Sequence, residues 1–166
     1  MNKQIIMEEY DKFPLKVKEL IFEHLEKGDW DALESLIIYF QYCKSPIEKI
    51  LFTALYILTN DELYMDIQHE IKYNNQTYYA DMCIMHDEYI NNYLKDDFKL
   101  AIECDGFDFH HKNKEQVDYD NKREYDIKSL GYDVLRFSGT KIFKEPIECA
   151  KEILKYIALK GMKKDE

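Results

Sequence analysis

The segment FKLAIECDG, residues 98–106, constrains the fold of this chain more than any other. Its unbroken apolar centre is typical of a strand that is buried on both faces in the middle of a sheet. Glu103 nevertheless lies inside that run, and Asp105 follows two residues later. A plain turn over Cys104–Gly106 explains Asp105 but not Glu103, because burying a carboxylate costs free energy unless a partner compensates its charge. The segment therefore predicts a central strand that carries a functional acidic site.

The N-terminal part of the chain has a helical pattern. Residues 14–27 carry apolar side chains near helical spacing and stop at Gly28, and Asp29 can cap a second helix that extends to about Tyr42. These patterns predict two helices in an N-terminal extension that we place at residues 1–43.

A third helix has a well-defined start. Ser45 is a natural N-cap, Pro46 occupies the first helical position, and Glu48 stands three residues after the cap, as in a capping box. Capping by itself is a sufficient structural explanation of Glu48, and a functional role is an equally good reading.

The period then changes from helix to strand. Two runs rich in β-branched and aromatic residues flank an Asn-Asn-Gln turn, which is a hairpin signal. The predicted strands are 65–73, 77–86, 98–104 and 133–137, and the later predicted helices are 113–130 and 146–160. This order favours an α/β fold with a central mixed sheet of four to five strands flanked by helices, in which strands 98–104 and 133–137 form a right-handed crossover. We place this domain at residues 44–160 and a tail at 161–166.

Composition limits the class of protein. A chain of 166 residues is of the size of one domain, and a hydrophobic fraction of 46% argues against disorder. No segment approaches the ~18 consecutive apolar residues of a membrane helix. The formal net charge of −10 argues against binding nucleic acid by bulk electrostatics alone. Residues 136–164 are basic, which fits either a phosphate-facing side or an ordinary solvated helix.

The cysteines and the N-terminus indicate a reducing compartment. Cys43, Cys83, Cys104 and Cys149 are far apart and form no CxxC pair, which argues against a structural zinc site and favours buried free thiols. The start of the chain has early acids and lacks the basic and apolar regions of a secretory signal. We therefore expect a cytoplasmic protein.

The carboxylates at the ends of two predicted strands are expected to converge. Glu103 and Asp105 share a face because side chains alternate along a strand, and Asp81 lies on the second strand of the hairpin. Clustered carboxylates repel each other, so either their pKa values rise or a hard divalent ion binds. With oxygen ligands, Mg²⁺ is the natural occupant and Mn²⁺ a substitute.

Several segments in this order resemble the PD-(D/E)XK nuclease superfamily. They are Glu48 in SPIEKILFTAL, Asp81 in ADMCI, IECDG at 102–106, FHH at 109–111, and the long stretch 114–142. The likeness is to the small domains related to the very-short-patch-repair mismatch endonuclease. It spans about residues 44–155, and the ordered combination is far more specific than any one piece.

The resemblance implies a restriction-endonuclease-like core and a metal-dependent phosphodiesterase. By position, the helix-borne acid falls on Glu48, the first strand acid on Asp81, and the second strand acid on Glu103. The implied metal ligands are Asp81 and Glu103, with Asp105 or the backbone carbonyl of Cys104. Asp105 departs from the pattern, since it stands where the superfamily has a lysine, and the role of activating the nucleophile is left unassigned. A second metal at Glu48 stays open.

Other residues are candidates for that role and for binding the substrate. His110 is the first candidate for a general base or phosphate partner because imidazole titrates near neutrality. Lys114 and Gln116 are substitutes that can reach back from the next helix. The predicted nucleic-acid contacts are His111, Arg123, Arg136 and Lys141. Arg123 lies on a stripe with Asp120, and a structural ion pair between them is an equally good reading.

The leading hypothesis is a Mg²⁺-dependent endonuclease that acts on DNA, including nicking. A catalytically inactive domain that binds nucleic acid or a protein partner is an alternative, because the motif lysine is missing. A nuclease directed at RNA is a third hypothesis.

Overall fold

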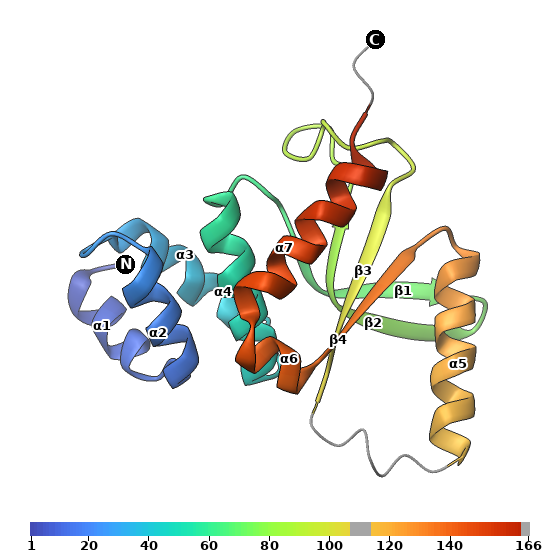
Figure 1. The fold of residues 1–166 in the computed structure, drawn as a ribbon, viewed down its shortest axis with the longest axis horizontal. Coiled ribbons are helices and arrows are strands. Elements are labelled where there is room, and N and C mark those ends of the chain that lie inside the picture. Colours follow the sequence, from blue (N-terminus) through green and yellow to red (C-terminus); the bar gives the residue numbers. More distant parts are fainter. Residues whose placement is uncertain (107–113, 164–166) are drawn as a thin grey trace.

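The computed structural model describes residues 1–106 and 114–163 of the chain. Helices lie on both sides of a sheet, and the first helices lie beyond α4, away from the sheet (Figure 1). The helices are α1 (Lys3–Asp11), α2 (Leu15–His24), α3 (Trp30–Phe40), α4 (Pro46–Thr59), α5 (Lys114–Ser129), α6 (Gly139–Lys144) and α7 (Pro146–Tyr156), followed by a π-helical turn, η2 (Ile157–Gly161). The strands are β1 (Asp66–Tyr73), β2 (Gln76–Met85), β3 (Lys99–Asp105) and β4 (Asp133–Ser138).

Within the described residues, the strands form one four-stranded sheet in the order β1-β2-β3-β4. The hairpin strands β1 and β2 pair antiparallel, β2 pairs antiparallel with β3, and β3 pairs parallel with β4. Parallel neighbours need a crossover connection, and α5 provides it. The predicted mixed sheet flanked by helices, with N-terminal helices, is confirmed.

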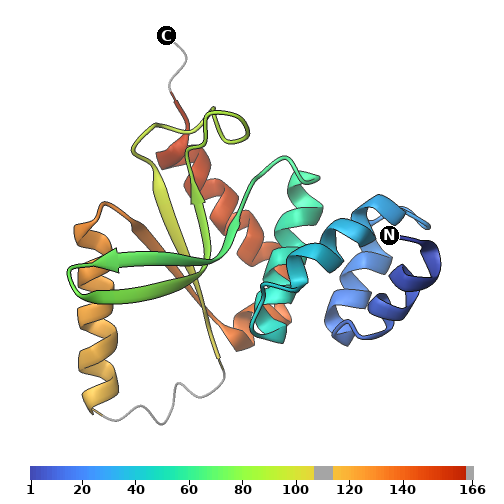
Figure 2. The same cartoon turned by 180° about the vertical axis from the view of Figure 1, so that it is seen from behind.

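Strand β3 lies between β2 and β4, and both of its faces are covered by helices (Figure 2). Leu100 and Ile102 belong to the main core, which also contains residues of α4 and α7. Ala101 points the other way and belongs to a smaller cluster with Ile127 of α5. This two-sided burial is the physical reason for the unbroken apolar run in the sequence.

Helix α1 was not predicted from the sequence. Asn2 caps it by accepting a hydrogen bond from the backbone N–H of Ile5. Ile6 is its buried residue, whereas Ile5 and Met7 beside it are largely exposed. One buried side chain gives no recognisable helical stripe, and packing against α3 decides the conformation instead.

Helix α6 was also not predicted, and its first residue, Gly139, packs against the end of β3. Ser138 caps it by accepting from the backbone N–H of Lys141. A Cβ atom at Gly139 would lie only 3.0 Å from the carbonyl oxygen of Asp105, so glycine permits the close approach of α6 to the strand. The predicted helix 146–160 is α7 followed by η2.

In the part of the chain that the structure describes, no helix has the length and apolar character to cross a membrane. The 16-residue helix α5 is shorter than the ~20 residues that a span requires, and it is highly charged.

Candidate functional site

The site lies where β2 bends beside the end of β3. In a regular strand Ala80 and Met82 would share a face, but Ala80 belongs to the cluster next to α5 and Met82 to the main core. The pairing of β1 with β2 skips Gln68 and Asp81, which lie between the pairs Ile67–Met82 and His69–Ala80 at this bend. Gln68 has a φ of 57°, in the left-handed region, which costs about 1–3 kcal/mol for a residue other than glycine. Such strain at a polar cluster is typical of a functional site.

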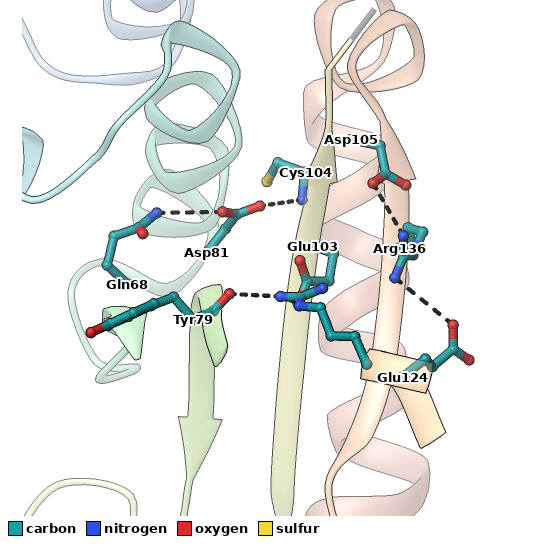
Figure 3. Close-up of polar contacts among 9 residues, drawn as sticks. Gln68, Tyr79, Asp81, Glu103, Cys104, Asp105, Glu124 and Arg136 are labelled. Atoms are coloured by element: carbon teal, nitrogen blue, oxygen red, sulfur yellow. Dashed lines mark hydrogen bonds and ion pairs between the residues drawn. The ribbon is translucent and has the colours of Figure 1, made fainter. Parts of the chain in front are cut away.

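Both carboxylate oxygens of Asp81 accept hydrogen bonds (Figure 3). Oδ2 accepts from the backbone N–H of Cys104 at 2.7 Å, and Oδ1 accepts from the Gln68 amide at 3.3 Å. The carboxylate thus takes the place of a backbone acceptor where the ladder between β2 and β3 stops. Burial nevertheless raises the pKa of Asp81, nearby Glu48 raises it further, and the Cys104 N–H opposes both effects. Its negative charge is therefore only partly compensated.

Glu48 is 4% exposed and lies at the start of α4. Its Oε2 accepts from the backbone N–H of Lys44 at 2.9 Å and from the Gln68 amide at 3.0 Å. Ser45 caps the same helix by accepting from the backbone N–H of Glu48. Glu48 thus has a role at the helix start and is also linked to Asp81 through the side chain of Gln68.

Gln68 is a site residue that sequence analysis missed. It is one polar side chain in a strand of mixed character, and nothing in the spacing distinguishes it. Its amide nitrogen donates to the carboxylates of both Glu48 and Asp81, so it reduces the repulsion between them. Only its left-handed backbone and its position opposite the bend of β2 identify it.

Glu103 is 6% exposed on the face of β3 that is covered by α5. Nη2 of Arg123 donates to Glu103 Oε1 at 2.7 Å and to the backbone carbonyl of Tyr79 at 2.6 Å. Burial raises the pKa of Glu103, and the neighbouring guanidinium lowers it without cancelling that effect. Arg123 therefore joins α5, β2 and β3 around a carboxylate whose charge it compensates only in part.

Asp105, at the end of β3, is paired with an arginine from the next strand (Figure 3). Nη1 of Arg136 donates to Asp105 Oδ1 at 3.3 Å, and Nη2 lies 3.8 Å from Oε2 of Glu124 on α5. The parallel register places Arg136 beside Glu103. Because β3 and β4 were predicted to belong to one crossover unit, the sequence already indicated that Arg136 and Asp105 could pair.

The carboxylates do not gather as tightly as expected. Among the described residues, no three His, Cys, Asp or Glu side chains form a group that could hold a metal ion. The reason is that Asp81 turns towards the Cys104 N–H and Gln68, whereas Glu103 and Asp105 turn towards arginines. The expected convergence of three carboxylates on one ion is therefore corrected: hydrogen-bond donors and guanidinium groups provide the compensation.

A smaller donor set is consistent with Mg²⁺. This ion is commonly bound by one or two carboxylates and keeps several water molecules. Asp81 is among the charges that raise the pKa of Glu103, so the two carboxylates are close enough to interact. Two carboxylates with incompletely compensated charge, with the Cys104 carbonyl between Glu103 and Asp105, fit such an ion by donor chemistry.

The thiols near the site are inert. Burial raises the pKa of Cys43 to about 12 and that of Cys104 well above its ordinary value, and the nearby carboxylates Glu48 and Asp81 add to both shifts. A thiolate is the form that attacks or ligates, so neither cysteine is a nucleophile at neutral pH.

A hollow of about 740 Å³ lies beside Glu48 and the end of β3. Glu48 and Cys104 line it together with Leu15, Ile47 and Phe143. Leu15 and Phe143 are 73% and 50% exposed. A second hollow, of about 520 Å³, lies among the N-terminal helices, away from these acids. Of the candidate site acids only Glu48 lines the first hollow, which gives that end of the site a concave surface of the kind that binds ligands.

The remaining predicted site residues lie elsewhere. His110 and His111 lie outside the described residues, and so do the side chains of Lys114 and Gln116. Lys141 is on α6, where its Nζ pairs with Glu152 of α7 at 2.7 Å. Their predicted roles stay predictions.

Asp81→Asn is expected to raise the melting temperature at neutral pH. Because the pKa of Asp81 is raised in the folded state, the protonated carboxyl stabilises the fold relative to the charged carboxylate. This stabilisation is fully present below the ordinary pKa and is lost as pH rises through the folded-state pKa. The asparagine has no charge to bury, and its carbonyl can still accept from Cys104. Thermal unfolding at pH 7 measures this change in melting temperature.

Asp87→Asn is the control, and it is expected to lower the melting temperature, since N–H donors of Tyr89 and Ile90 lower the pKa of Asp87. A melting temperature below that of wild type for Asp81→Asn would contradict the conclusion that the charge of Asp81 is only partly compensated.

Comparison with known proteins gives one match. A family model described as REase_MTES_1575 matches residues 61–157, more than half of the chain. The comparisons with curated proteins and with solved structures returned no match. The matched span contains all four strands and the residues Asp81, Glu103, Asp105, Arg123 and Arg136, and Glu48 lies before it.

Proposed function

The chain belongs to the REase_MTES_1575 family of restriction-endonuclease-like proteins, and from this we propose that it is an endonuclease hydrolysing phosphodiester bonds in DNA. The observation that carries the proposal is the pair of acids on neighbouring strands, the buried Glu103 and the half-buried Asp81, with pKa values raised by desolvation. Carboxylates whose pKa values are shifted by burial and by charged neighbours are typical of catalytic sites. A relation to the very-short-patch-repair endonuclease is part of the proposal, as is the division at residue 43.

We propose Mg²⁺, with Mn²⁺ as a substitute, as the cofactor. Asp81 and Glu103 would hold it, with the Cys104 carbonyl as a further ligand. Such an ion supplies a Lewis acid for the scissile phosphate and lowers the pKa of a bound water. Two acids with raised pKa values support the proposal, because a cation would remove the cost of keeping both ionised.

The residues of the chain orient these acids. Arg123 fixes Glu103 against the carbonyl of Tyr79, and Gln68 fixes Asp81 against Glu48. We propose His110 as general base, and His111, Arg136 and Lys141 as contacts to phosphate. These positively charged or neutral groups would offset repulsion between DNA and a chain of formal net charge −10.

The experiment that tests the function is cleavage of a supercoiled plasmid. We expect nicked product with Mg²⁺ and none with EDTA. A linear oligonucleotide duplex and a single-stranded RNA are tested in parallel, because they separate a DNA enzyme from one directed at RNA. If none of these substrates is cut with Mg²⁺ or Mn²⁺, the proposal fails and a binding domain of the same family remains.

The pH dependence of cleavage is a second test. Asp81 and Glu103 act as anions, and burial raises the pKa of both. The acidic limb of the kcat/KM profile is therefore expected above the ordinary carboxyl range of about 4. Raising the Mg²⁺ concentration should move this limb to lower pH, because metal and protons compete for the same oxygens. A limb at the ordinary value that does not respond to Mg²⁺ would contradict the assignment.

A further inference from the structure

The positive charge of the missing motif lysine has a candidate replacement in the structure. Asp105 stands where the superfamily pattern has lysine, and Arg136 is paired with Asp105. Resting on the proposed function, we propose that Arg136 is a catalytic residue that binds the non-bridging oxygens of the scissile phosphate. In this arrangement Asp105 positions the guanidinium and Arg136 carries the charge.

The register of the sheet places Arg136 correctly for this role. Glu103 and Arg136 are partners in the parallel pairing of β3 with β4, so their side chains lie on the same face of the sheet. Asp105, two residues along β3, shares that face with Glu103. The contacts agree, because Arg136 reaches Asp105 on β3 and Glu124 on α5. A cation therefore lies directly beside the site acids although it comes from another strand.

The two arginines of the site are held differently. Arg123 has short bonds of 2.7 Å to Glu103 and 2.6 Å to the Tyr79 carbonyl, and its side chain is 14% exposed. The distances from Arg136 to its two partners are 3.3 Å and 3.8 Å, and its side chain is 26% exposed. Charge-assisted hydrogen bonds are normally about 2.7–2.9 Å. Arg123 thus has the geometry of a positioning residue, whereas Arg136 is held loosely enough to engage a ligand.

The chemistry of arginine defines what Arg136 can do. In hydrolysis a water oxygen bonds to phosphorus and loses a proton to the general base, while the bond from phosphorus to the leaving oxygen breaks and that oxygen gains a proton from the medium. Negative charge develops on the phosphoryl oxygens. Arginine stays protonated in proteins, so Arg136 moves no proton. Its planar guanidinium can bind two phosphate oxygens and stabilise this charge, as a lysine would from position 105.

A charge-relocation experiment tests the proposal. Cleavage of an oligonucleotide duplex with Mg²⁺ is measured for wild type, Arg136→Gln, Arg136→Lys and the double variant Asp105→Lys with Arg136→Gln. We expect kcat to fall about 10²-fold in Arg136→Gln, the typical effect of removing one donor to a developing anion. We expect Arg136→Lys to keep most activity, and the double variant to recover at least about tenfold over Arg136→Gln. Lys128→Gln, which removes an exposed partner of Glu124, is the matched control and should stay active.

Melting temperatures confirm that each variant is folded, and the outcomes separate the two hypotheses. A wild-type chain that cuts nothing overturns the proposed function and this role with it. A wild type that cuts together with an equally active Arg136→Gln overturns the role alone. If Arg136→Gln is folded and inactive but the double variant is no better, the missing element is not a relocated charge, and the proposal is overturned.

Discussion

Glu103→Gln is expected to reduce kcat/KM for DNA cleavage by at least about 10³-fold, the scale of losing a central catalytic group. The glutamine can still accept the hydrogen bond from Arg123, so the contact between α5 and β3 survives while the negative charge is lost. Because only the charge changes, we expect the loss in kcat rather than in DNA binding, which is measured separately by anisotropy of a labelled duplex.

The matched control for this variant is Glu148→Gln. Glu148, on α7, also carries a carboxylate paired with a cation, Lys151 at 2.7 Å, but it is exposed and is not one of the proposed site acids. Its substitution should leave cleavage within a few-fold of wild type. A Glu103→Gln variant that retains full activity would remove the basis of the proposed chemistry.

Of the variants proposed here, Ile102→Ala is expected to lower the free energy of unfolding most. Ile102 is fully buried in the main core, on the face of β3 opposite to Glu103. Truncating such a side chain costs about 2–5 kcal/mol, because the cavity relaxes only in part. For a chain of this length each kcal/mol lowers the melting temperature by about 2–4 °C. Thermal or urea unfolding measures the loss.

The control is Leu159→Ala, because Leu159 is 72% exposed and its truncation should change stability by less than about 0.5 kcal/mol. At low temperature, where it is folded, Ile102→Ala should cleave DNA normally. Adjacent residues of one strand would then separate the two functions of β3: the even position supports the core and the odd position supports the chemistry. Equal stability losses in Ile102→Ala and Leu159→Ala would contradict the burial on which this rests.

Most of the fold could be predicted from local pattern. Ser45, Pro46 and the periodic residues after them define the start of α4, and the apolar run at 98–104 identifies β3 as the central strand. The predicted helix 113–130 corresponds to α5. Helices α1 and α6 were not predicted, because their conformation depends on packing against α3 and on the close approach of Gly139 to Asp105.

The candidate site was predictable only in its acids. Asp81, Glu103 and Asp105 stand out because charges at buried strand ends need compensation. Their partners come from other elements: Gln68 from β1, Arg123 from α5 and Arg136 from β4. Sequence analysis assigned Arg136 to the substrate and left Arg123 between the substrate and an ion pair with Asp120, whereas both pair with site acids in the structure.

The sequence by itself determined that this chain forms an α/β sheet with acids at the end of its central strand, because strand periodicity and the cost of burying charge act over a few neighbouring residues. Only the tertiary structure decided how that charge is compensated. The left-handed Gln68, the bend at Asp81 and the parallel register that brings Arg136 beside Glu103 arise from contacts between elements far apart in the chain. Local pattern carries no information on which distant donor reaches a given carboxylate, because that choice depends on how the strands pair and where α5 packs.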